Sequence, residues 1–497
     1  MDIDTEGGKE RQVCRCTLRR SHLHNTLPPR NLQFLESWAS AVSGVERLLI
    51  LDAYETNIPH KTRRSAPENP FTTPVIHPCL PYIQDERLDE GEETNPQVET
   101  DSPITKQTIN KISMKARIIA LYLPQFHPIP ENDLWWGPGF TEWTNVAKAK
   151  PLFRGHLQPR IPADLGFYDL RLEETRIQQA ELAREAGIEG FCYYHYWFGG
   201  KQLLERPFNE VVQSGKPDFP FCLCWANHSW SNKTWNRKSN LQPNSMLMEQ
   251  VYPGEQDDIN HFMHLLPAFK DKRYMCVEGK PIFVLYEPMH HPKVKQWIKT
   301  WRRLATEHGL PGLYLIGMTP NTLTNRKSDN NKFGFSKPNL KSSADLYQDI
   351  LDMGFDAVNS VGKRRGEMLS SNMYLDLAKT IMRKAGLPIV SKYNYLKTVK
   401  GFFAPEDNWE RVYPTIMPQW DRTPRVNNYD GIYVDATPEN FLKHIEHAIN
   451  VIKDKPEEHR ILFLKSWNEW GEGNYVEPDT EFGHGWLDAI KKSLENT

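Results

Sequence analysis

The chain is 497 residues long, which is enough for two to three domains or for one large barrel with appendages. Lys and Arg number 61 and Asp and Glu number 63, so the formal net charge of −2 points neither to nucleic acid nor to an acidic membrane surface. No apolar run approaches the roughly 20 residues that a membrane helix needs, and the N-terminal residues lack the apolar core of a signal peptide. We therefore expect a soluble, cytoplasmic protein with no membrane span and no nucleic-acid partner.

Residues 1–115 differ in composition from the rest of the chain. Basic and polar runs, a proline-rich stretch and an acidic stretch follow one another there, which is typical of a segment that cannot bury enough surface to fold. Within it, residues 32–52 have helix-like apolar spacing. We predict a low-order N-terminal segment over 1–115, with unknown partners, and a catalytic domain over 116–497.

From residue 117 onward, short apolar segments alternate with amphipathic ones. Strands are expected at 117–123, 190–194, 220–225, 282–286, 313–318, 355–359, 412–418 and 461–466. Helices are expected at 172–186, 201–214, 257–269, 292–308, 440–452 and 485–494. This alternation implies a parallel sheet with right-handed crossovers, and eight strands over about 380 residues predict a (β/α)₈ barrel with long loops.

A doubly wound open sheet is the alternative fold. Neither GxGxxG nor GxxxxGK[ST] follows any expected strand, so a dinucleotide or P-loop site has no support and no cofactor is expected. There is also no HExxH motif and no Cys/His cluster at zinc spacing, so no metal site is predicted. Cys222 and Cys224 alternate along one expected strand, which favours two buried thiols on one face of that strand over a disulfide.

The stretch 461–478, ILFLKSWNEWGEGNYVEP, carries the most specific chemical signal. Its apolar start suits a buried strand, and it then changes abruptly to polar and aromatic residues. Glu469 and Glu472 lie three residues apart among tryptophans and glycines, so both can project from one tight turn at the mouth of a strand. Paired carboxylates beside aromatic rings are what acid/base chemistry on a sugar requires. We predict that both are catalytic; two solvated glutamates in an exposed loop are the alternative.

In a (β/α)₈ barrel, the active site lies at the C-terminal ends of the strands. At least five of the eight expected strand ends supply an aromatic residue together with an amide, an imidazole or a carboxylate, a mixture typical of a carbohydrate cleft. The alternative is that these rings only fill the barrel mouth. The candidate substrate-binding residues are Tyr122, Gln125, His127, Trp143, Tyr194, His195, Trp197, Trp225, Asn227, Trp230, Glu287, Trp420, Asp421, Trp467 and Asn468.

Four stretches closely resemble the WbsX-like family: RIIALYLPQFHPIPENDLWWGPGFTEWTNVA at 117–147, GFCYYHYWFGGKQLLERP at 190–207, FCLCWANHSW at 221–230 and SWNEWGEGNYVEPD at 466–479. Proteins of that family are found with polysaccharide and O-antigen biosynthesis genes and are predicted glycosyltransferases. Their domain is related to the endo-α-mannosidase glycoside hydrolases, which are (β/α)₈ barrels. The resemblance spans about residues 115–495. It implies a carbohydrate-active enzyme of a polysaccharide or lipopolysaccharide O-antigen pathway, with a glycan or lipid-linked oligosaccharide as substrate.

The related hydrolases have an Asn-Glu-Trp-x-Glu segment after the last strand, and residues 468–472 match it. The resemblance implies that Glu469 is the base and Glu472 the acid/base; the hydrolases usually have His where Gly471 stands. Ordinary glycosidases place two carboxyl groups about 5–9.5 Å apart on opposite sides of the anomeric carbon, which two residues of one turn would struggle to do. We therefore predict that both act from the same side, as is thought for the related hydrolases, through an anhydro-sugar intermediate.

The sequence leaves hydrolase and transferase open. The one Asp-x-Asp element, Asp2/Asp4, lies in the irregular N-terminal segment, which favours a glycosidase or transglycosidase mechanism over a metal-bound nucleotide-sugar donor. A non-catalytic glycan-binding barrel is an alternative, although stacking alone needs no pair of glutamates. A scaffold protein of a polysaccharide assembly complex, drawing on residues 1–115, is a third possibility.

Overall fold

The computed structural model of the protein describes residues 115–232, 245–320, 342–371, 390–426 and 431–495. The predicted N-terminal segment, including its helix-like stretch at 32–52, therefore lies outside the described residues. The domain boundary near residue 115 stays a prediction.

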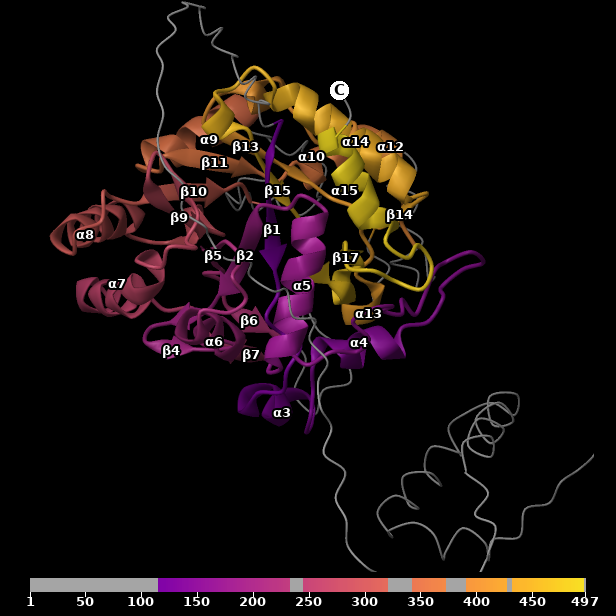
Figure 1. Cartoon of the computed structure of the whole chain (residues 1–497), viewed down its shortest axis with the longest axis horizontal. Helices are drawn as coiled ribbons and strands as arrows, with labels where there is room; N and C mark the ends of the chain where they lie inside the picture. Colours follow the sequence, from indigo (N-terminus) through magenta and orange to yellow (C-terminus); the bar gives the residue numbers. More distant parts are fainter. Residues whose placement is uncertain (1–114, 233–244, 321–341, 372–389, 427–430, 496–497) are drawn as a thin grey trace, which may run out of the picture. The chain divides into compact units, whose positions relative to one another are not determined.

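Eight parallel strands form a closed barrel, seen in Figure 1. Each strand pairs with its neighbour along the chain, and the last pairs with the first, so the sheet has no open edge. The predicted (β/α)₈ barrel is confirmed, and the doubly wound open sheet is excluded. The strands are β1 (Arg117–Tyr122), β2 (Gly190–His195), β5 (Phe221–Trp225), β9 (Lys280–Leu285), β10 (Tyr314–Met318), β11 (Ala357–Ser360), β13 (Val412–Ile416) and β15 (Ile461–Leu464).

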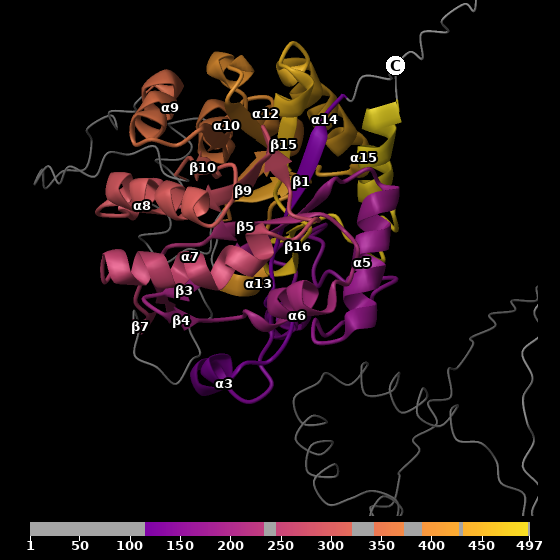
Figure 2. The ribbon, with the colours of Figure 1, turned by 60° about the vertical axis from the view of Figure 1, so that its left-hand side comes forward.

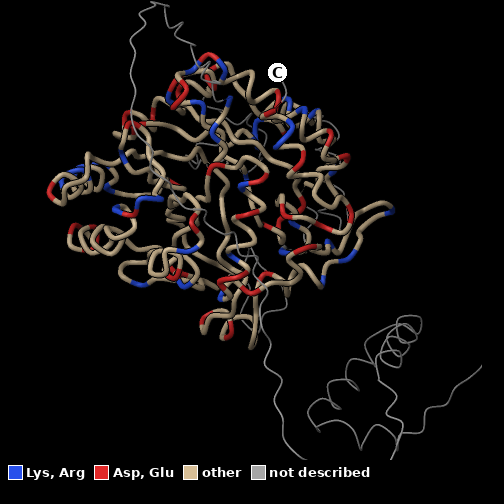
Figure 3. The backbone as a smooth tube through the Cα atoms, viewed as in Figure 1, with Lys and Arg blue, Asp and Glu red and all other residues tan. Residues whose placement is uncertain are grey.

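Helices surround these strands, as Figures 1 and 2 show. They are α5 (Glu173–Glu185), α6 (Arg206–Ser214), α7 (Glu255–Phe269), α8 (Val294–Glu307), α9 (Ser343–Asp352), α14 (Pro438–Ile452) and α15 (Gly485–Glu495). All six expected helices are present; α9 was not predicted. Charged residues of both signs are interspersed over the helices and loops in Figure 3. Among the described helices, none combines the length and the apolar composition needed to cross a lipid bilayer.

Smaller elements occupy the connections between strands and helices. The helical ones are α3 (Pro130–Trp136), α4 (Glu142–Lys148), α10 (Lys363–Ser370), α12 (Tyr395–Val399) and α13 (Thr423–Val426). The extended ones are β3 (Trp197–Phe198), β4 (Lys201–Gln202), β6 (Trp230–Ser231), β7 (Met246–Met248), β8 (Cys276–Val277), β12 (Lys392–Asn394), β14 (Ile432–Val434), β16 (Asn468–Glu469) and β17 (Asn474–Tyr475). Because β3 and β4 form a hairpin, α6 begins later than its apolar pattern predicted.

Helix α8 illustrates how the outer ring is held to the barrel. Its apolar residues recur every three to four positions and form one buried face. Trp297 and Trp301 on this face are fully buried, with ring centroids 4.7 Å apart, and Trp301 lies 4.8 Å from Phe283 of β9. Burying rings of this size contributes much of the packing energy of a core. Cys222 and Cys224 of β5 are fully buried free thiols, as predicted.

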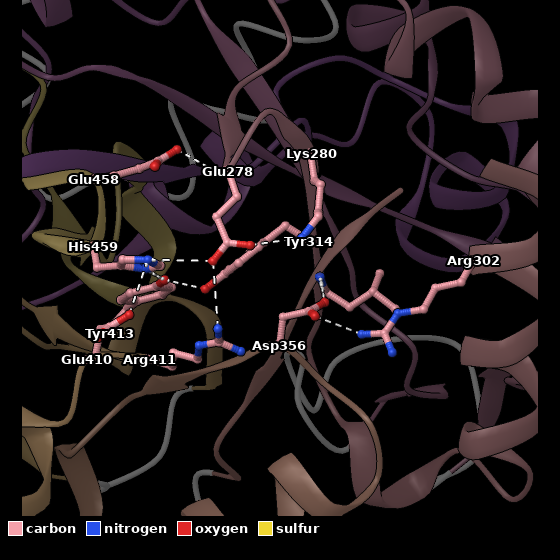
Figure 4. A network of polar contacts seen from close by, with 11 residues as sticks. Glu278, Lys280, Arg302, Tyr314, Asp356, Glu410, Arg411, Tyr413, Glu458 and His459 are labelled. Atoms are coloured by element: carbon pink, nitrogen blue, oxygen red, sulfur yellow. Dashed lines mark hydrogen bonds and ion pairs between the residues drawn. The ribbon is translucent and has the colours of Figure 1, made fainter. Parts of the chain in front are cut away.

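A polar network lies at the N-terminal end of the barrel, opposite the strand ends that were predicted to carry the site (Figure 4). The hydroxyl of Tyr413 lies 2.7 Å from that of Tyr314 and 2.7 Å from Nδ1 of His459. Asp356, just before β11, accepts hydrogen bonds from Arg302 and from the backbone of Leu315. Contacts at the N-terminal end of such a barrel serve stability rather than catalysis.

We expect Tyr413→Phe to lower the free energy of unfolding by about 1–3 kcal/mol, because it leaves two buried polar partners without their shared hydroxyl. Urea denaturation of the variant and the wild type checks the size of the effect. Turnover should be unchanged because the hydroxyl lies at the end of the barrel opposite the site. Lost turnover with unchanged stability would contradict this assignment.

Candidate active site

A cavity of about 270 Å³ lies at the C-terminal ends of the barrel strands. Side chains that follow β1, β2, β5, β9, β11, β13 and β15 converge on it. It is lined by Leu123, Gln125, Tyr194, Tyr196, Ala226, His228, Ser229, Trp230, Tyr286, Lys363, Trp420, Arg422, Arg425, Lys465, Glu469 and Glu472. Both predicted catalytic glutamates therefore face the same space as several aromatic rings.

The two glutamates project from one compact turn after β15. Glu469 ends β16, which pairs antiparallel with β17, and Glu472 ends the 3₁₀ turn Trp470–Glu472 between them. The ring of Trp470 stacks on that of Tyr475 at a centroid distance of 3.6 Å, which fixes the turn. Glu469 is 5% exposed and Glu472 is 8% exposed. These side chains are not in an exposed, solvated loop.

A single guanidinium group holds both glutamates. Arg425 of α13 donates from Nη1 to Glu472 at 2.8 Å and from Nη2 to Glu469 at 3.3 Å, while its Nε donates to Glu142 of α4 at 3.1 Å. The planar fork of arginine suits this multiple contact, which a lysine could not reproduce. Because the two glutamates contact neighbouring nitrogens of one group, they lie on the same side of the cavity.

The surroundings separate the proton affinities of the two carboxyl groups. Burial, together with the charge of Glu472, raises the pKa of Glu469 to about 7. Burial also acts to raise the pKa of Glu472, but Arg425 and Arg422 outweigh it and lower that pKa to about 2. Arg422 Nε lies 3.1 Å from Glu472 Oε1. Below about pH 7 the pair therefore carries one proton, and the opposite directions of the two shifts favour Glu469 as its holder.

The glycine between the two glutamates is explained by Glu142. A Cβ atom at Gly471 would lie 1.8 Å from Oε1 of Glu142 and 2.7 Å from its Cδ. Glu142 is fully buried, so its carboxylate has little room to move away. The glycine thus leaves room for a third carboxylate against the turn.

We expect Gly471→Ala to lower the free energy of unfolding by about 1–3 kcal/mol through this overlap. The cost should largely disappear in a Glu142→Ala background, because the atoms that meet the new methyl group are then absent. A double-mutant cycle measured by denaturant unfolding gives the coupling directly. Equal costs in the two backgrounds would show that something other than Glu142 requires the glycine.

Four of the predicted substrate-binding residues line the cavity together with the two glutamates: Gln125, Tyr194, Trp230 and Trp420. Trp230 makes an edge contact with the ring of Tyr196 at 5.0 Å, and Trp420 carries the ammonium group of Lys363 over its face at 4.1 Å. Aromatic faces with polar neighbours are suited to stacking on sugar rings.

Three predicted aromatic residues pack in the hydrophobic core instead. Tyr122 donates to Gln179 at 2.7 Å, and Trp143 donates from its indole to the backbone oxygen of Tyr168 at 2.8 Å. Trp467 is fully buried and packs on Phe191 at 5.0 Å. Their rings belong to the hydrophobic core, and none of the three lines the cavity.

Another group of predicted residues surrounds the buried His261 of α7. His195 and His261 approach each other through their Nε2 atoms at 2.8 Å, and Trp197 stacks on His261 at 4.6 Å. Trp225 meets the same imidazole edge-on at 4.8 Å. These rings join the mouth of the barrel to α7 and do not line the cavity.

Two predicted amide residues fix backbone segments beside the cavity. Asn227 donates to the backbone oxygen of Glu287 at 3.0 Å and accepts from its backbone nitrogen at 2.8 Å. Asn468 makes the same kind of paired contact with the backbone of Leu123, at 2.7 and 3.1 Å. The carboxylate of Glu287 itself contacts His290. These contacts position the loops around the cavity.

Asp421 and His127 are also placed in the framework around the cavity. Asp421 is fully buried and accepts hydrogen bonds from Gln158 at 2.6 Å and from the Thr423 hydroxyl at 2.7 Å, and it contacts His156 at 2.7 Å. Burial opposes these contacts, which nevertheless lower the pKa of Asp421 to about 2. His127 is buried, and burial lowers its pKa to about 4. The binding roles of all these framework residues stay predictions.

Several lining residues had not been selected from the sequence. Tyr286 and Lys465 directly follow β9 and β15. The expectation that site residues follow the C-terminal ends of the strands therefore applied to both. Arg422 and Arg425 follow β13 within one loop and helix, where nothing in the sequence singles out a basic residue. Lys363 carries no motif signal. Glu142, which lies behind the lining, falls within the family-like stretch 117–147 but was not selected from it. In the described part of the chain, no group of three or more His, Cys, Asp or Glu side chains is arranged to hold a metal ion.

A family model described as "Glycosyltransferase WbsX" matches residues 118–490. Proteins described as uncharacterized protein WxcX, from two strains of Xanthomonas campestris pv. campestris, are 34% identical over 385 residues, which cover 77% of this chain and 50% of theirs. The chain thus spans about half the length of these relatives.

Two solved structures are also similar to this chain. One is described as a glycoside hydrolase-like protein, with a TM-score of 0.48 and 14% identity over 80% of this chain and 98% of the other. The GH99 endo-α-mannosidase of Bacteroides thetaiotaomicron has a TM-score of 0.40 and 13% identity over 76% of this chain and 95% of its own.

The family match runs from the second residue of β1 into α15 and thus includes all eight barrel strands and the turn that carries both glutamates. It confirms the resemblance seen in the sequence. The chain belongs to the WbsX glycosyltransferase family, a family of carbohydrate-active enzymes.

Proposed function

We propose that the protein makes or breaks glycosidic bonds in a glycan, with Glu469 and Glu472 as the acid/base pair. The observation that carries this proposal is the pair itself: two buried carboxylates from one turn, held by one guanidinium group, with the pKa of Glu469 raised to about 7 and that of Glu472 lowered to about 2. A pair of titratable groups with such different environments is typical of an acid and a base in one active site. The pathway, a polysaccharide or O-antigen pathway, rests on the resemblance alone.

The charge states favour Glu469 as the proton donor. Its carboxyl group holds the proton near neutral pH and can protonate the glycosidic oxygen as the bond to the anomeric carbon breaks. The ionised Glu472 can take the proton of a neighbouring sugar hydroxyl, whose oxygen then attacks the anomeric carbon. This is the reverse of the assignment that the resemblance implied.

The same-side position of the two carboxylates supports an intermediate in which the sugar hydroxyl, rather than the enzyme, forms the new bond. Water that opens this anhydro-sugar gives hydrolysis, and a hydroxyl group of another glycan gives transfer. In either case Glu469, now ionised, accepts the proton of the incoming hydroxyl. Glu472 returns its proton to the oxygen of the anhydro bridge as its bond to the anomeric carbon breaks, which restores the sugar hydroxyl. The proton balance therefore closes in one cycle without a nucleotide-sugar donor.

A donor-free glycan screen tests the proposal. The full chain is incubated with a panel of polysaccharides and oligosaccharides without nucleotide sugars, and the products are identified by mass spectrometry with Glu472→Gln as the matched control. We expect cleavage or glycan-to-glycan transfer that the control lacks. If no product formed without a donor but the glycan chain was extended once nucleotide sugars were supplied, the mechanism would be overturned. Glycan binding without any turnover would favour a non-catalytic glycan-binding barrel.

The shared proton predicts the pH dependence of the reaction. The active form carries one proton, so kcat/KM should be highest below pH 7 and fall about tenfold per pH unit above it, as Glu469 loses its proton. At the acid end, activity should persist until Glu472 becomes protonated, near pH 2, or until the protein unfolds. Measuring kcat/KM from pH 4 to 10 checks the predicted fall in activity above pH 7. Activity that rises through pH 7 would contradict the one-proton form.

A further inference from the structure

The cavity is lined by more cationic than anionic side chains. Lys363, Arg422, Arg425 and Lys465 face it together with only two carboxylates, those of Glu469 and Glu472. Behind the lining, Glu142 pairs with Arg425, and Glu367 pairs with Lys363 at 2.5 Å. Even with these two carboxylates counted, the cluster carries excess positive charge when Glu469 holds its proton. The excess has to be located on one of the four cations.

Lys465 is the cation without a close counter-ion. Its side chain is 4% exposed, and within the described residues its ammonium group makes no hydrogen bond or ion pair. It lies 5.8 Å from the ring centroid of Tyr286. Burial acts to lower its pKa, but the neighbouring Tyr286, Glu469 and Glu472 outweigh burial and raise that pKa, so the ammonium group stays charged. A buried charge without a hydrogen-bonded partner is costly, which makes this group a binding site for a negative charge.

Other lining groups are also left without hydrogen-bond partners inside the described part of the chain. They are Nε2 of Gln125, the hydroxyl of Tyr194 and Nδ1 of His228, and all three atoms are buried. An amide NH₂ can only donate, and a phenol can donate. The cavity therefore offers one open group that only donates and two, the phenol and the imidazole nitrogen, that are able to donate, which suits an acceptor-rich group such as a carboxylate or a phosphate.

We infer that this cavity binds a glycan bearing an anionic substituent, a carboxylate or a phosphate, whose charge pairs with Lys465 beside the two glutamates. The inference rests on the proposed function, because it names the substrate class of the same site. A neutral sugar would satisfy donors through its hydroxyl groups but would leave the ammonium group without a hydrogen-bonded counter-ion. An anion at Lys465 would also add negative charge near Glu469 and keep that carboxyl group protonated to higher pH in the complex.

The test is a binding measurement on the full-length Glu469→Gln variant, whose turnover is expected to be strongly reduced and whose amide mimics the protonated carboxyl group. The probes are matched glycans that differ in one group: a hexuronate and the corresponding hexose, and a phosphorylated sugar and its unphosphorylated form. We expect at least one acidic member to bind about tenfold or more tightly than its neutral partner at low salt, with the difference shrinking as salt rises. The two pairs separate a carboxylate from a phosphate as the anion.

Lys465→Met in the same background should abolish the preference for the acidic member. Replacing a buried unpaired charge by an apolar side chain of similar length should not prevent folding, and Lys465→Gln provides a second variant. Lys299→Met, on the exposed side of α8, removes the same charge far from the cavity and should keep the preference. Loss of the preference with Lys299→Met would point to net charge rather than to Lys465.

Equal binding of acidic and neutral members, binding of neutral members alone, or no binding of any acidic member would overturn the inference. A preference that survives in both Lys465 variants would overturn the assignment to this lysine. The outcomes also separate the inference from the proposed function. Acidic glycans that bind without being turned over by the wild type would leave the inference standing and remove the function, whereas turnover confined to neutral glycans would do the opposite.

Discussion

Glu469→Gln is expected to lower turnover of a glycan by about 10³-fold, because a buried general acid of this kind contributes about 10²–10⁴-fold. The loss in kcat/KM should be much smaller on an aryl glycoside whose leaving group departs without protonation. The reason is that kcat/KM reports the bond-breaking step, for which the proton of Glu469 is then not needed. Kinetics of both substrates, measured on the wild type and the variant, check this difference. The upper limb of the pH profile near 7 should also disappear in the variant.

Glu472→Gln is the matched control for this experiment. Activation of the attacking hydroxyl is needed with either leaving group, so this variant should lose about 10³-fold on both substrates. If instead Glu472→Gln were the variant rescued by a good leaving group, the two glutamates would have the roles that the resemblance implied. The experiment thus assigns acid and base directly, which a pH profile of a coupled pair cannot do.

Arg425→Met is expected to lower kcat/KM by about 100-fold or more and to lower the free energy of unfolding by about 3–5 kcal/mol, because it leaves buried carboxylates without their shared cation. Glu142, Glu469 and Glu472 would then repel one another, and the pKa of Glu472 would rise from about 2. The acid limb of the pH profile should move to higher pH. Denaturant unfolding and the pH profile measure the two effects separately.

A variant that simply fails to fold would hide the electrostatic effect. Adding Glu142→Gln to Arg425→Met removes one buried charge and should restore part of the stability but not the activity. Arg425→Lys keeps the charge without the three-way fork, so it should fold and show an intermediate shift of the acid limb. An acid limb unchanged in all three variants would show that Arg425 does not set the pKa of Glu472.

Much of the scaffold was accessible from the sequence for simple physical reasons. Buried strands require continuous apolar runs, so segments such as RIIALY and ILFL marked β1 and β15 with their neighbours in the barrel. An amphipathic helix such as α8 repeats its apolar residues about every 3.6 positions, and the spacing of Trp297 and Trp301 follows this repeat. The short helix α9 was missed, whereas the start of α6 was placed too early because the pattern did not reveal the hairpin of β3 and β4.

The position of a residue just after a strand did not by itself separate residues that line the cavity from residues that pack elsewhere. It identified Gln125, Tyr194, Trp230 and Trp420, which line the cavity, but it also selected His195, Trp197 and Trp467, which pack elsewhere. An aromatic residue at the mouth of a barrel can line the cavity or pack in the core, and the direction of its side chain decides between the two. That direction depends on the loops and helices packed against each strand end, so no local pattern reveals it.

By itself, the sequence determined the barrel, its strand order and the turn that carries Glu469 and Glu472, because each depends on local periodicity or on residues adjacent along the chain. Only the tertiary structure decided the chemistry of that turn. Arg425 comes from the loop after β13 and Glu142 from the connection after β1, and they meet the glutamates because the barrel closes on itself. Proton affinity depends on charges and burial in space, so the separation of the two pKa values exists only once these distant segments are assembled.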